Sequence, residues 1–250
     1  MIEFAIGIKK YILSSNDDRR RGKSRMKKLT GKLFKVLATM LMIVMLFSIA
    51  APLASACHDP SHDEEVYSDS HGHWAYWYIG WAMQNGISTG FPDGTFRPNA
   101  SVTRAEFVTF LHRVAGEPEA SVEAEFPDMP NTAEFRAAIS WAVEAGVVTG
   151  FDDGTFRPRS PIHRQQIAAM LFRYADSLEL STVAPEGELD RFNDDYLVAD
   201  WAVGGMAWAV YQSLITGQRG GFLAPRSNAT RAETVTILRR FVATFEIELP

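Results

Sequence analysis

Three short segments of this 250-residue chain place an arginine directly after a helix-capping position. They read Thr103-Arg104-Ala105-Glu106, His163-Arg164-Gln165-Gln166 and Thr230-Arg231-Ala232-Glu233. In the first and third segments the Thr hydroxyl can accept from the Glu backbone N–H, and the Glu side chain can reach back to the cap. The second segment exchanges both capping residues and still keeps its arginine. Helix capping therefore accounts for the Thr and Glu residues but not for the arginines.

An exposed arginine at a helix start is suited to binding an anion. The guanidinium fork binds a carboxylate or a phosphate through two parallel hydrogen bonds. The backbone N–H groups of the first helical turn are free there, and the positive end of the helix dipole adds to the attraction. We therefore predict that Arg104, Arg164 and Arg231 bind an acidic ligand, in preference to a purely structural role.

These segments recur because the chain is internally repeated. A shift of 60 positions aligns residues 86–98 with residues 146–158, and ten of the thirteen residues are identical. A further shift of 67 positions aligns Trp141 with Trp208 and reveals a weaker third copy. Such self-similarity indicates structural units that stack against one another. We place the three repeats at residues 66–116, 126–176 and 192–243.

Each repeat reads as a helix, a turn and a second helix. The turn of the first copy contains an Asp-Gly pair, which suits positions that need a positive φ. The second helix has apolar residues at amphipathic spacing, which in the first copy are Phe107, Phe110, Leu111 and Val114. One apolar face per repeat is too little for a separate core, so we predict a mainly α fold in which three helix-turn-helix repeats pack together. The first helix of each repeat holds a tryptophan that we also expect in the core: Trp81, Trp141 and Trp208.

The two parts of the chain differ in charge. Residues 1–56 hold eleven Lys and Arg against three acidic residues, whereas residues 57–250 hold fourteen Arg, no Lys and 27 acidic residues. Nucleic-acid binding requires a basic surface, so the acidic part argues against a nucleic-acid partner. It also lacks the common motifs of hydrolases, metalloproteases and phosphate-binding enzymes. We therefore predict that the chain is not an enzyme and uses no cofactor.

The basic part contains a targeting signal. Several lysines precede an apolar run over residues 36–51, and an A-S-A sequence follows as a signal-peptidase site. We interpret residues 26–56 as a signal peptide and residues 1–25 as a non-native extension upstream of it. An uncleaved transmembrane helix is the alternative, because residues 36–56 are uncharged and long enough to span a bilayer.

The mature chain would begin at Cys57, which is the only cysteine, so an intrachain disulfide cannot form. The preceding "LASA" resembles a lipobox and makes Cys57 a candidate for lipidation. Its leucine lies one position too far upstream, so an ordinary secreted N-terminus is the alternative. Residues 57–65 form a tail rich in His and acidic residues, where Pro60 disfavours the helix that a His pair would need to bind a metal. We predict no metal site.

Each copy carries further residues of a known pattern. The first contains Tyr67-Ser68-Asp69 and His73-Trp74-Ala75, and the second contains Phe126-Pro127-Asp128. The third contains Phe192-Asn193-Asp194 and Asp200-Trp201-Ala202. Together with the D-G-T-F turns and the T-R-A-E segments, this arrangement resembles the S-layer homology (SLH) domain family in three tandem copies. The resemblance implies a pseudo-threefold helical bundle that is secreted to the cell wall or cell surface.

The resemblance also implies a ligand, a secondary cell-wall polysaccharide linked to peptidoglycan. Such polymers often bear pyruvate ketals, and they bind in grooves between repeats, where the arginine after each cap meets the acidic group. The other residues that the resemblance implies are Trp74, Trp201, Asp69, Asp128 and Asp194. The second copy has Glu134 or Phe135 where a tryptophan is expected, and the third lacks the D-G-T turn. We therefore expect two competent grooves.

Two other functions fit the same sequence. A structural role in an S-layer or envelope assembly would involve an envelope protein partner and ordered self-association. A membrane-to-wall tether would keep an anchor within residues 36–57, through lipid on Cys57 or through an uncleaved helix. Binding to isolated cell walls, ordered assembly and the mass of the mature protein distinguish the three functions.

Overall fold

The computed structural model of the protein describes residues 67–250, so the predictions for the extension, the signal peptide, Cys57 and the tail lie outside the described residues. The described part contains six α-helices, two 3₁₀ helices and no β-strand, which confirms the mainly α prediction. The α-helices are α2 (Tyr76–Gln84), α3 (Arg104–Val114), α4 (Ala133–Glu144), α5 (Arg164–Ser177), α6 (Val203–Tyr211) and α7 (Arg231–Thr244). The 3₁₀ helices are η1 (Asp195–Leu197) and η2 (Asp200–Ala202).

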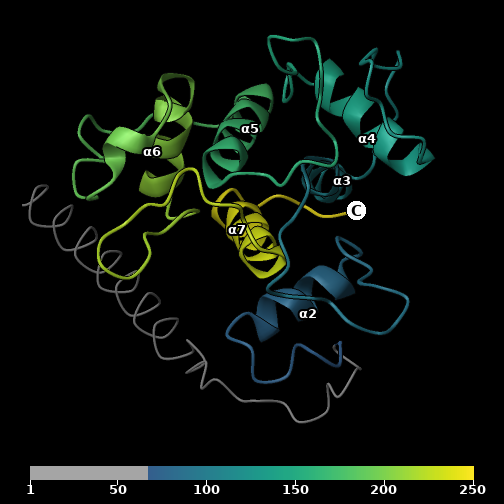
Figure 1. Ribbon diagram of the computed structural model, residues 1–250, viewed down its shortest axis with the longest axis horizontal. Helices are drawn as coiled ribbons and strands as arrows, with labels where there is room; N and C mark the ends of the chain where they lie inside the picture. Colours follow the sequence, from purple (N-terminus) through teal and green to yellow (C-terminus); the bar gives the residue numbers. More distant parts are fainter. Residues whose placement is uncertain (1–66) are drawn as a thin grey trace, which may run out of the picture. The chain divides into compact units, whose positions relative to one another are not determined.

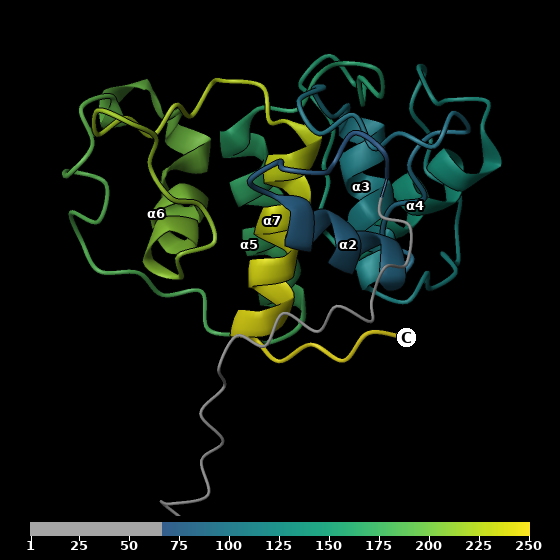
Figure 2. The same cartoon turned by 90° about the horizontal axis from the view of Figure 1, so that it is seen from below.

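The α-helices pair mainly across the boundaries between repeats. α3 packs on α4, α5 packs on α6, and α2 packs on α7 from the other end of the described chain. In Figure 1 the second helices of the repeats, α3, α5 and α7, lie in the middle, with α2, α4 and α6 outside them. Figure 2 shows α2 lying against α7. This last contact closes the three repeats into a pseudo-threefold bundle.

The core lies between these helices and contains the predicted apolar faces. Its fully buried side chains include Phe107, Leu111, Ile167, Leu171, Leu238 and Phe241. Trp141 and Trp208 are buried as predicted, whereas Trp81 is only partly buried. Each large apolar side chain that is fully buried contributes about 2 kcal/mol to the free energy of unfolding. Burial of these side chains between the helices therefore contributes substantially to stability.

Three backbone segments meet just before α3, α5 and α7. Val102 N donates to Ala229 O at 3.0 Å, Ala229 N donates to Ile162 O at 2.9 Å, and Ile162 N donates to Val102 O at 2.9 Å. All three residues are fully buried. Each stands two positions before one of the three arginines, so this closed ring of hydrogen bonds holds the three helix starts around one point.

The helix starts use the predicted capping boxes. Thr103 Oγ1 accepts from Glu106 N at 3.2 Å, and Thr103 N donates to Glu106 Oε2 at 2.7 Å. The same pair of bonds begins α7. At the start of α5, Gln166 Oε1 accepts from His163 N at 2.9 Å, and Gln166 N donates to the backbone carbonyl of His163. The second copy thus keeps the half of the box that uses the side chain of residue 166.

The turn after each first helix packs an aromatic ring against a glycine. A Cβ atom on Gly90, where φ is +63°, would overlap the Tyr67 ring, and the second copy repeats this contact. Gly217 packs against Phe192 in the same way. The third copy therefore keeps the turn although it lacks the D-G-T sequence.

Candidate functional site

The three arginines are buried, which corrects the expectation of exposed side chains. Arg104, Arg164 and Arg231 are each 4% exposed. The N–H groups at their helix starts are not free either, because Arg104 N donates to Ser160 O at 2.9 Å and the next N–H donates to Pro158 O at 3.0 Å. The same contacts recur at the other two junctions. The start of each second helix docks onto the turn of another repeat, which spacing in the sequence does not reveal.

Each arginine side chain reaches a backbone carbonyl in that turn. The three bonds join Arg104 Nε to Phe156 O (2.8 Å), Arg164 Nε to Leu223 O (3.1 Å) and Arg231 Nε to Phe96 O (2.8 Å). Repeat 1 therefore docks on repeat 2, repeat 2 on repeat 3, and repeat 3 on repeat 1. All three arginines help to hold neighbouring repeats together.

The terminal nitrogens of the arginines differ between junctions. Arg164 Nη1 pairs with Glu233 Oε1 at 3.3 Å, and its Nη2 donates to Thr216 O at 2.9 Å. Arg231 makes an equivalent ion pair with the capping-box glutamate at its own junction. Arg104 forms no hydrogen bond from either terminal nitrogen to a residue within 67–250. Its guanidinium is therefore only partly used by the fold.

A groove lies beside two of the three arginines. The first groove, with a volume of about 310 Å³, is lined by residues that include Arg104, residues 148–152, Gln166, Arg173 and Trp201. The second groove, of about 140 Å³, is lined by residues that include Trp74, Arg164, residues 214–218, Glu233 and Arg240. Trp74 and Trp201 are 60% and 56% exposed. Each groove thus combines an arginine from one repeat, a turn and helix from the next, and a tryptophan from the remaining one.

The third junction has no tryptophan at this place. Glu134 on α4 occupies the equivalent position and forms an ion pair with Arg113. Arg113 also donates to Ile87 O at 2.9 Å. An acidic side chain therefore neutralises an arginine here, whereas the first and second grooves each present a tryptophan.

A second recurring arginine, not predicted from the sequence, also contacts the turns. It stands nine residues after the arginine that follows the helix cap in each repeat, and this constant spacing was the available signal. Its Nη1 donates to a backbone carbonyl that lies three residues after the end of the first helix of the same repeat. The pairs are Arg113 to Ile87, Arg173 to Val147 and Arg240 to Leu214. Arg173 and Arg240 line the first and second grooves, so each groove contains two arginines.

The three aspartates of the repeat pattern support the turns and do not line the grooves. Asp69 accepts from Phe96 N and Arg97 N, both at 2.8 Å. Asp128 and Asp194 accept from the matching N–H pairs at 2.6–2.9 Å. The carbonyl of Phe96 in turn accepts from the arginine of another repeat. Each carboxylate therefore positions the turn on which an arginine docks, and none of the three borders the first or second groove.

Burial makes the arginine charges costly. It lowers the pKa of Arg104 to about 10, with the charge of Arg157 as the next cause. Burial also lowers the pKa of Arg164 and of Arg231, while their glutamate partners act in the opposite direction. Arg104 nevertheless remains protonated near pH 7. Its positive charge thus persists in a groove where no carboxylate is paired with it.

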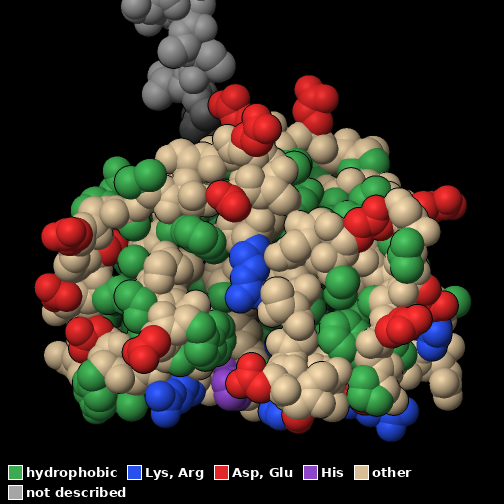
Figure 3. Space-filling model, turned by 90° about the horizontal axis from the view of Figure 1, so that it is seen from above, with side chains coloured by type: hydrophobic (Ala, Val, Ile, Leu, Met, Phe, Trp, Pro, Cys, Tyr) green, Lys and Arg blue, Asp and Glu red, His purple; other side chains and the backbone are tan. Residues whose placement is uncertain are grey.

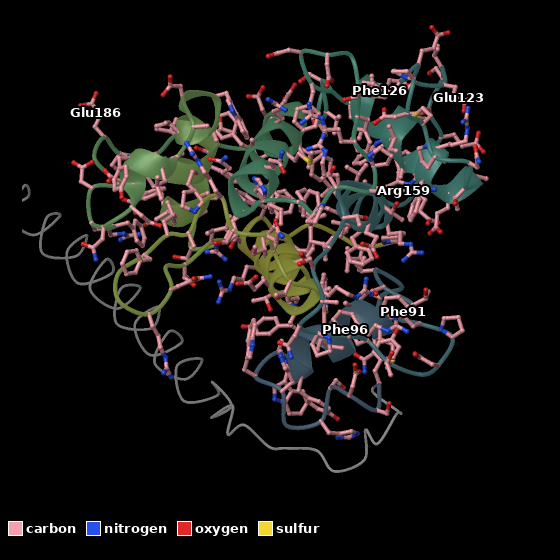
Figure 4. All side chains as sticks on the ribbon, viewed as in Figure 1. Phe91, Phe96, Glu123, Phe126, Arg159 and Glu186 are labelled. Atoms are coloured by element: carbon pink, nitrogen blue, oxygen red, sulfur yellow. The ribbon has the colours of Figure 1, made fainter. Side chains whose placement is uncertain are left out.

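Aromatic rings surround the buried guanidinium groups. Arg104 Cζ lies 4.6 Å from the ring centre of Phe151. Arg231 Cζ lies 4.8 Å from the ring centres of Phe91 and Phe96, which belong to the turn beside α2 (Figure 4). Such contacts offset part of the lost hydration of each cation. Figure 3 shows a basic side chain near the middle of one face, surrounded mostly by uncharged and hydrophobic atoms.

No metal centre is formed by the described residues. Residues 67–250 contain no group of three or more His, Cys, Asp or Glu side chains placed to hold a metal ion. The His73 ring instead contacts Asn99 Oδ1 at 3.3 Å and accepts from Ala75 N at 3.2 Å. Within the same stretch, no helix is both long enough and apolar enough to cross a bilayer.

Known proteins share these repeats. An endoglucanase of Bacillus sp. strain KSM-635 is 33% identical over 204 residues, which is 81% of this chain and 21% of the endoglucanase. A cellulosome-anchoring protein of Acetivibrio thermocellus is 35% identical over 106 residues, or 40% of this chain and 24% of that protein. A surface-layer 125 kDa protein of Lysinibacillus sphaericus is 29% identical over 160 residues, or 63% of this chain and 13% of that protein. The chain thus spans a quarter or less of each of these relatives.

The family model of the S-layer homology domain matches three segments, residues 66–108, 125–168 and 191–235. Each segment contains a turn aspartate and the arginine that docks on another repeat. With three matched repeats closed into one helical bundle, the chain belongs to the S-layer homology domain family.

Proposed function

We propose that this chain attaches to the bacterial cell wall by binding an acidic polysaccharide, with substituents such as pyruvate ketals, in the first and second grooves. The observation that carries the proposal is the meeting of one exposed tryptophan and two arginines in each groove. In the first groove these are Trp201, Arg104 and Arg173, from three different repeats. A groove of this composition fits a polymer that is both carbohydrate and anion.

The chemistry assigns a part to each side chain. The flat indole rings of Trp74 and Trp201 offer an apolar face and a polar edge, as a sugar ring requires of its partner. The arginines offer charge-assisted hydrogen bonds to the acidic substituent. The aspartates Asp69, Asp128 and Asp194 act indirectly, because they hold the turns on which the arginines dock.

The relatives support attachment over catalysis. One is named a cellulosome-anchoring protein and another a surface-layer protein, while the endoglucanase extends far beyond the shared region. What these proteins share with this chain is the repeat region. We infer that this region works at the cell surface by binding, and that the partner is a polymer of the wall.

Co-sedimentation of the full chain with purified cell-wall sacculi tests the proposal. Trp201→Ala removes the exposed ring from the first groove, and Trp74→Ala removes it from the second. Each variant should bind sacculi about tenfold more weakly. Tyr211→Ala is the matched control, because Tyr211 is 51% exposed and borders neither groove. It should bind as the unmodified chain does.

Sacculi stripped of their secondary polysaccharide supply the second control, and the chain should no longer pellet with them. If both tryptophan variants pellet as well as the unmodified chain, the grooves are not the binding site. If the chain fails to pellet with intact sacculi but forms ordered assemblies, a structural role in the envelope replaces this proposal.

A further inference from the structure

The first and second grooves differ at the position that faces the buried arginine. In the second groove, Glu233 uses Oε2 to accept from the helix cap and Oε1 to pair with Arg164. In the first groove, Gln166 stands at the equivalent position and uses its Oε1 to accept from His163 N at 2.9 Å. Its remaining terminal atom is an amide nitrogen, which can only donate. It therefore cannot pair with Arg104.

The first groove thus lacks the ion pair that engages the buried arginine of the second groove. Arg104 is 4% exposed and uses only Nε, which donates to Phe156 O, so both terminal nitrogens remain available. Arg173 adds a second positive charge to the lining. Asp152 is the one carboxylate among the lining residues that the structure describes; it is exposed and forms no ion pair with either arginine. The lining of the first groove is therefore complementary to an anionic group.

We propose, building on the function proposed above, that the first groove is the principal anion site and that Gln166 determines this specificity. A carboxylate or phosphate of the ligand binds between the Arg104 guanidinium and the Gln166 amide. In the second groove the carboxylate of Glu233 already occupies this place. That groove therefore contributes mainly through Trp74 and binds the acidic group less tightly than the first groove does.

Exchanging the two side chains tests this division. Gln166→Glu supplies the missing carboxylate, which should pair with Arg104 and compete with the ligand. The affinity for sacculi should fall at least about tenfold, as expected for the loss of a charge-assisted hydrogen bond. The melting temperature should rise by about 2 °C through the new ion pair. Weaker binding in a more stable protein is a result that structural damage does not produce.

Glu233→Gln is the matched variant in the second groove, and its affinity for sacculi should stay equal or rise. If Gln166→Glu pellets as well as the unmodified chain while Trp201→Ala does not, the polysaccharide proposal stands and the assigned role of Gln166 is wrong.

A small-anion titration separates the two proposals. The full chain is titrated with inorganic phosphate or with sodium pyruvate, and the indole N–H signal of Trp201, assigned through Trp201→Phe, is followed by NMR. The signal should shift in the unmodified chain and stay unchanged in Gln166→Glu. The anion with the larger shift indicates whether the group is a phosphate or a carboxylate. If the Trp201 signal shifts but the chain does not bind sacculi, the anion site stands and the polysaccharide proposal is wrong. If the signal shifts equally in the unmodified chain and in Gln166→Glu, the proposed anion site is wrong.

Discussion

Two junctions of the bundle share their backbone contacts but differ in the side-chain contacts of their arginines. They are the junction between repeats 1 and 2 and the junction between repeats 2 and 3. At both, an arginine Nε donates to a turn carbonyl and the first helical N–H groups dock on the same turn. At the second junction the guanidinium is fully engaged by Glu233 and Thr216, whereas at the first its terminal nitrogens are available. One residue type at one repeat position therefore makes different contacts at different junctions, and the neighbouring side chain, Glu233 or Gln166, decides between them.

The largest difference should appear when the arginines are removed. Arg231→Met and Arg164→Met each lose three side-chain contacts, so the free energy of unfolding should fall by about 3 kcal/mol. Arg104→Met loses one such contact and should cost about 1 kcal/mol. Chemical denaturation of the full chain measures all three. Because the three side chains are equally buried, equal losses would mean that burial and not hydrogen bonding sets their contribution.

A smaller effect should follow from removing the turn aspartates, which act alike at every junction. Asp194→Ala leaves the N–H groups of Leu223 and Ala224 without their carboxylate and should cost about 2 kcal/mol. Asp69 makes the same contacts in an exposed setting, where water can replace it, so Asp69→Ala should cost about half as much. Thermal unfolding of the two variants tests the order. A greater loss for Asp69→Ala would contradict the assignment of the effect to desolvation.

The smallest effect concerns how the free energy of unfolding changes at acidic pH. We expect this effect from the turns of copies 1 and 2 but not from copy 3. Hydrogen bonds from Thr95 and Arg97 lower the pKa of Asp93 to about 2, and equivalent bonds lower the pKa of Asp153. A lowered pKa in the folded state adds stability above the ordinary carboxyl pKa near 4, and this gain is lost as the pH falls toward about 2.

The test compares Asp93→Asn with the unmodified chain across that pH range. The variant should be less stable at neutral pH, and the difference should shrink between pH 4 and pH 2. Arg219→Gln, in the copy that lacks the Asp-Gly-Thr turn, serves as control and should show no such pH dependence. A constant difference for Asp93→Asn would mean that its carboxylate does not stabilise the turn.

Much of the fold was predictable because it depends on local chemistry. Helical spacing identified the buried faces of Phe107 and Leu111, and the Thr103 capping box marked the start of α3. Repetition of these signals indicated three packed units. Copy 3 was harder to judge, because Gly217 and Phe192 keep the turn contact after the D-G-T sequence has gone.

The site was predictable only in part. The sequence singled out Arg104, Trp74 and Trp201, and the structure puts each of them in a groove. The assumption of exposed arginines was wrong because the docking partner of each helix start lies in another repeat. For example, Arg231 and Phe96 are 135 positions apart.

The sequence by itself therefore determined the repeats, their helices, their caps and the residue types available for binding, since all of these follow from spacing and local hydrogen bonding. Only the tertiary structure decided which arginine meets which glutamate, and that Gln166 leaves Arg104 unpaired. Closure of the bundle brings distant side chains together, and buried charges interact strongly over such short distances. The exchange of a carboxylate for an amide at position 166 is conservative in the sequence, but in the closed bundle it leaves Arg104 without the ion pair that Arg164 and Arg231 make.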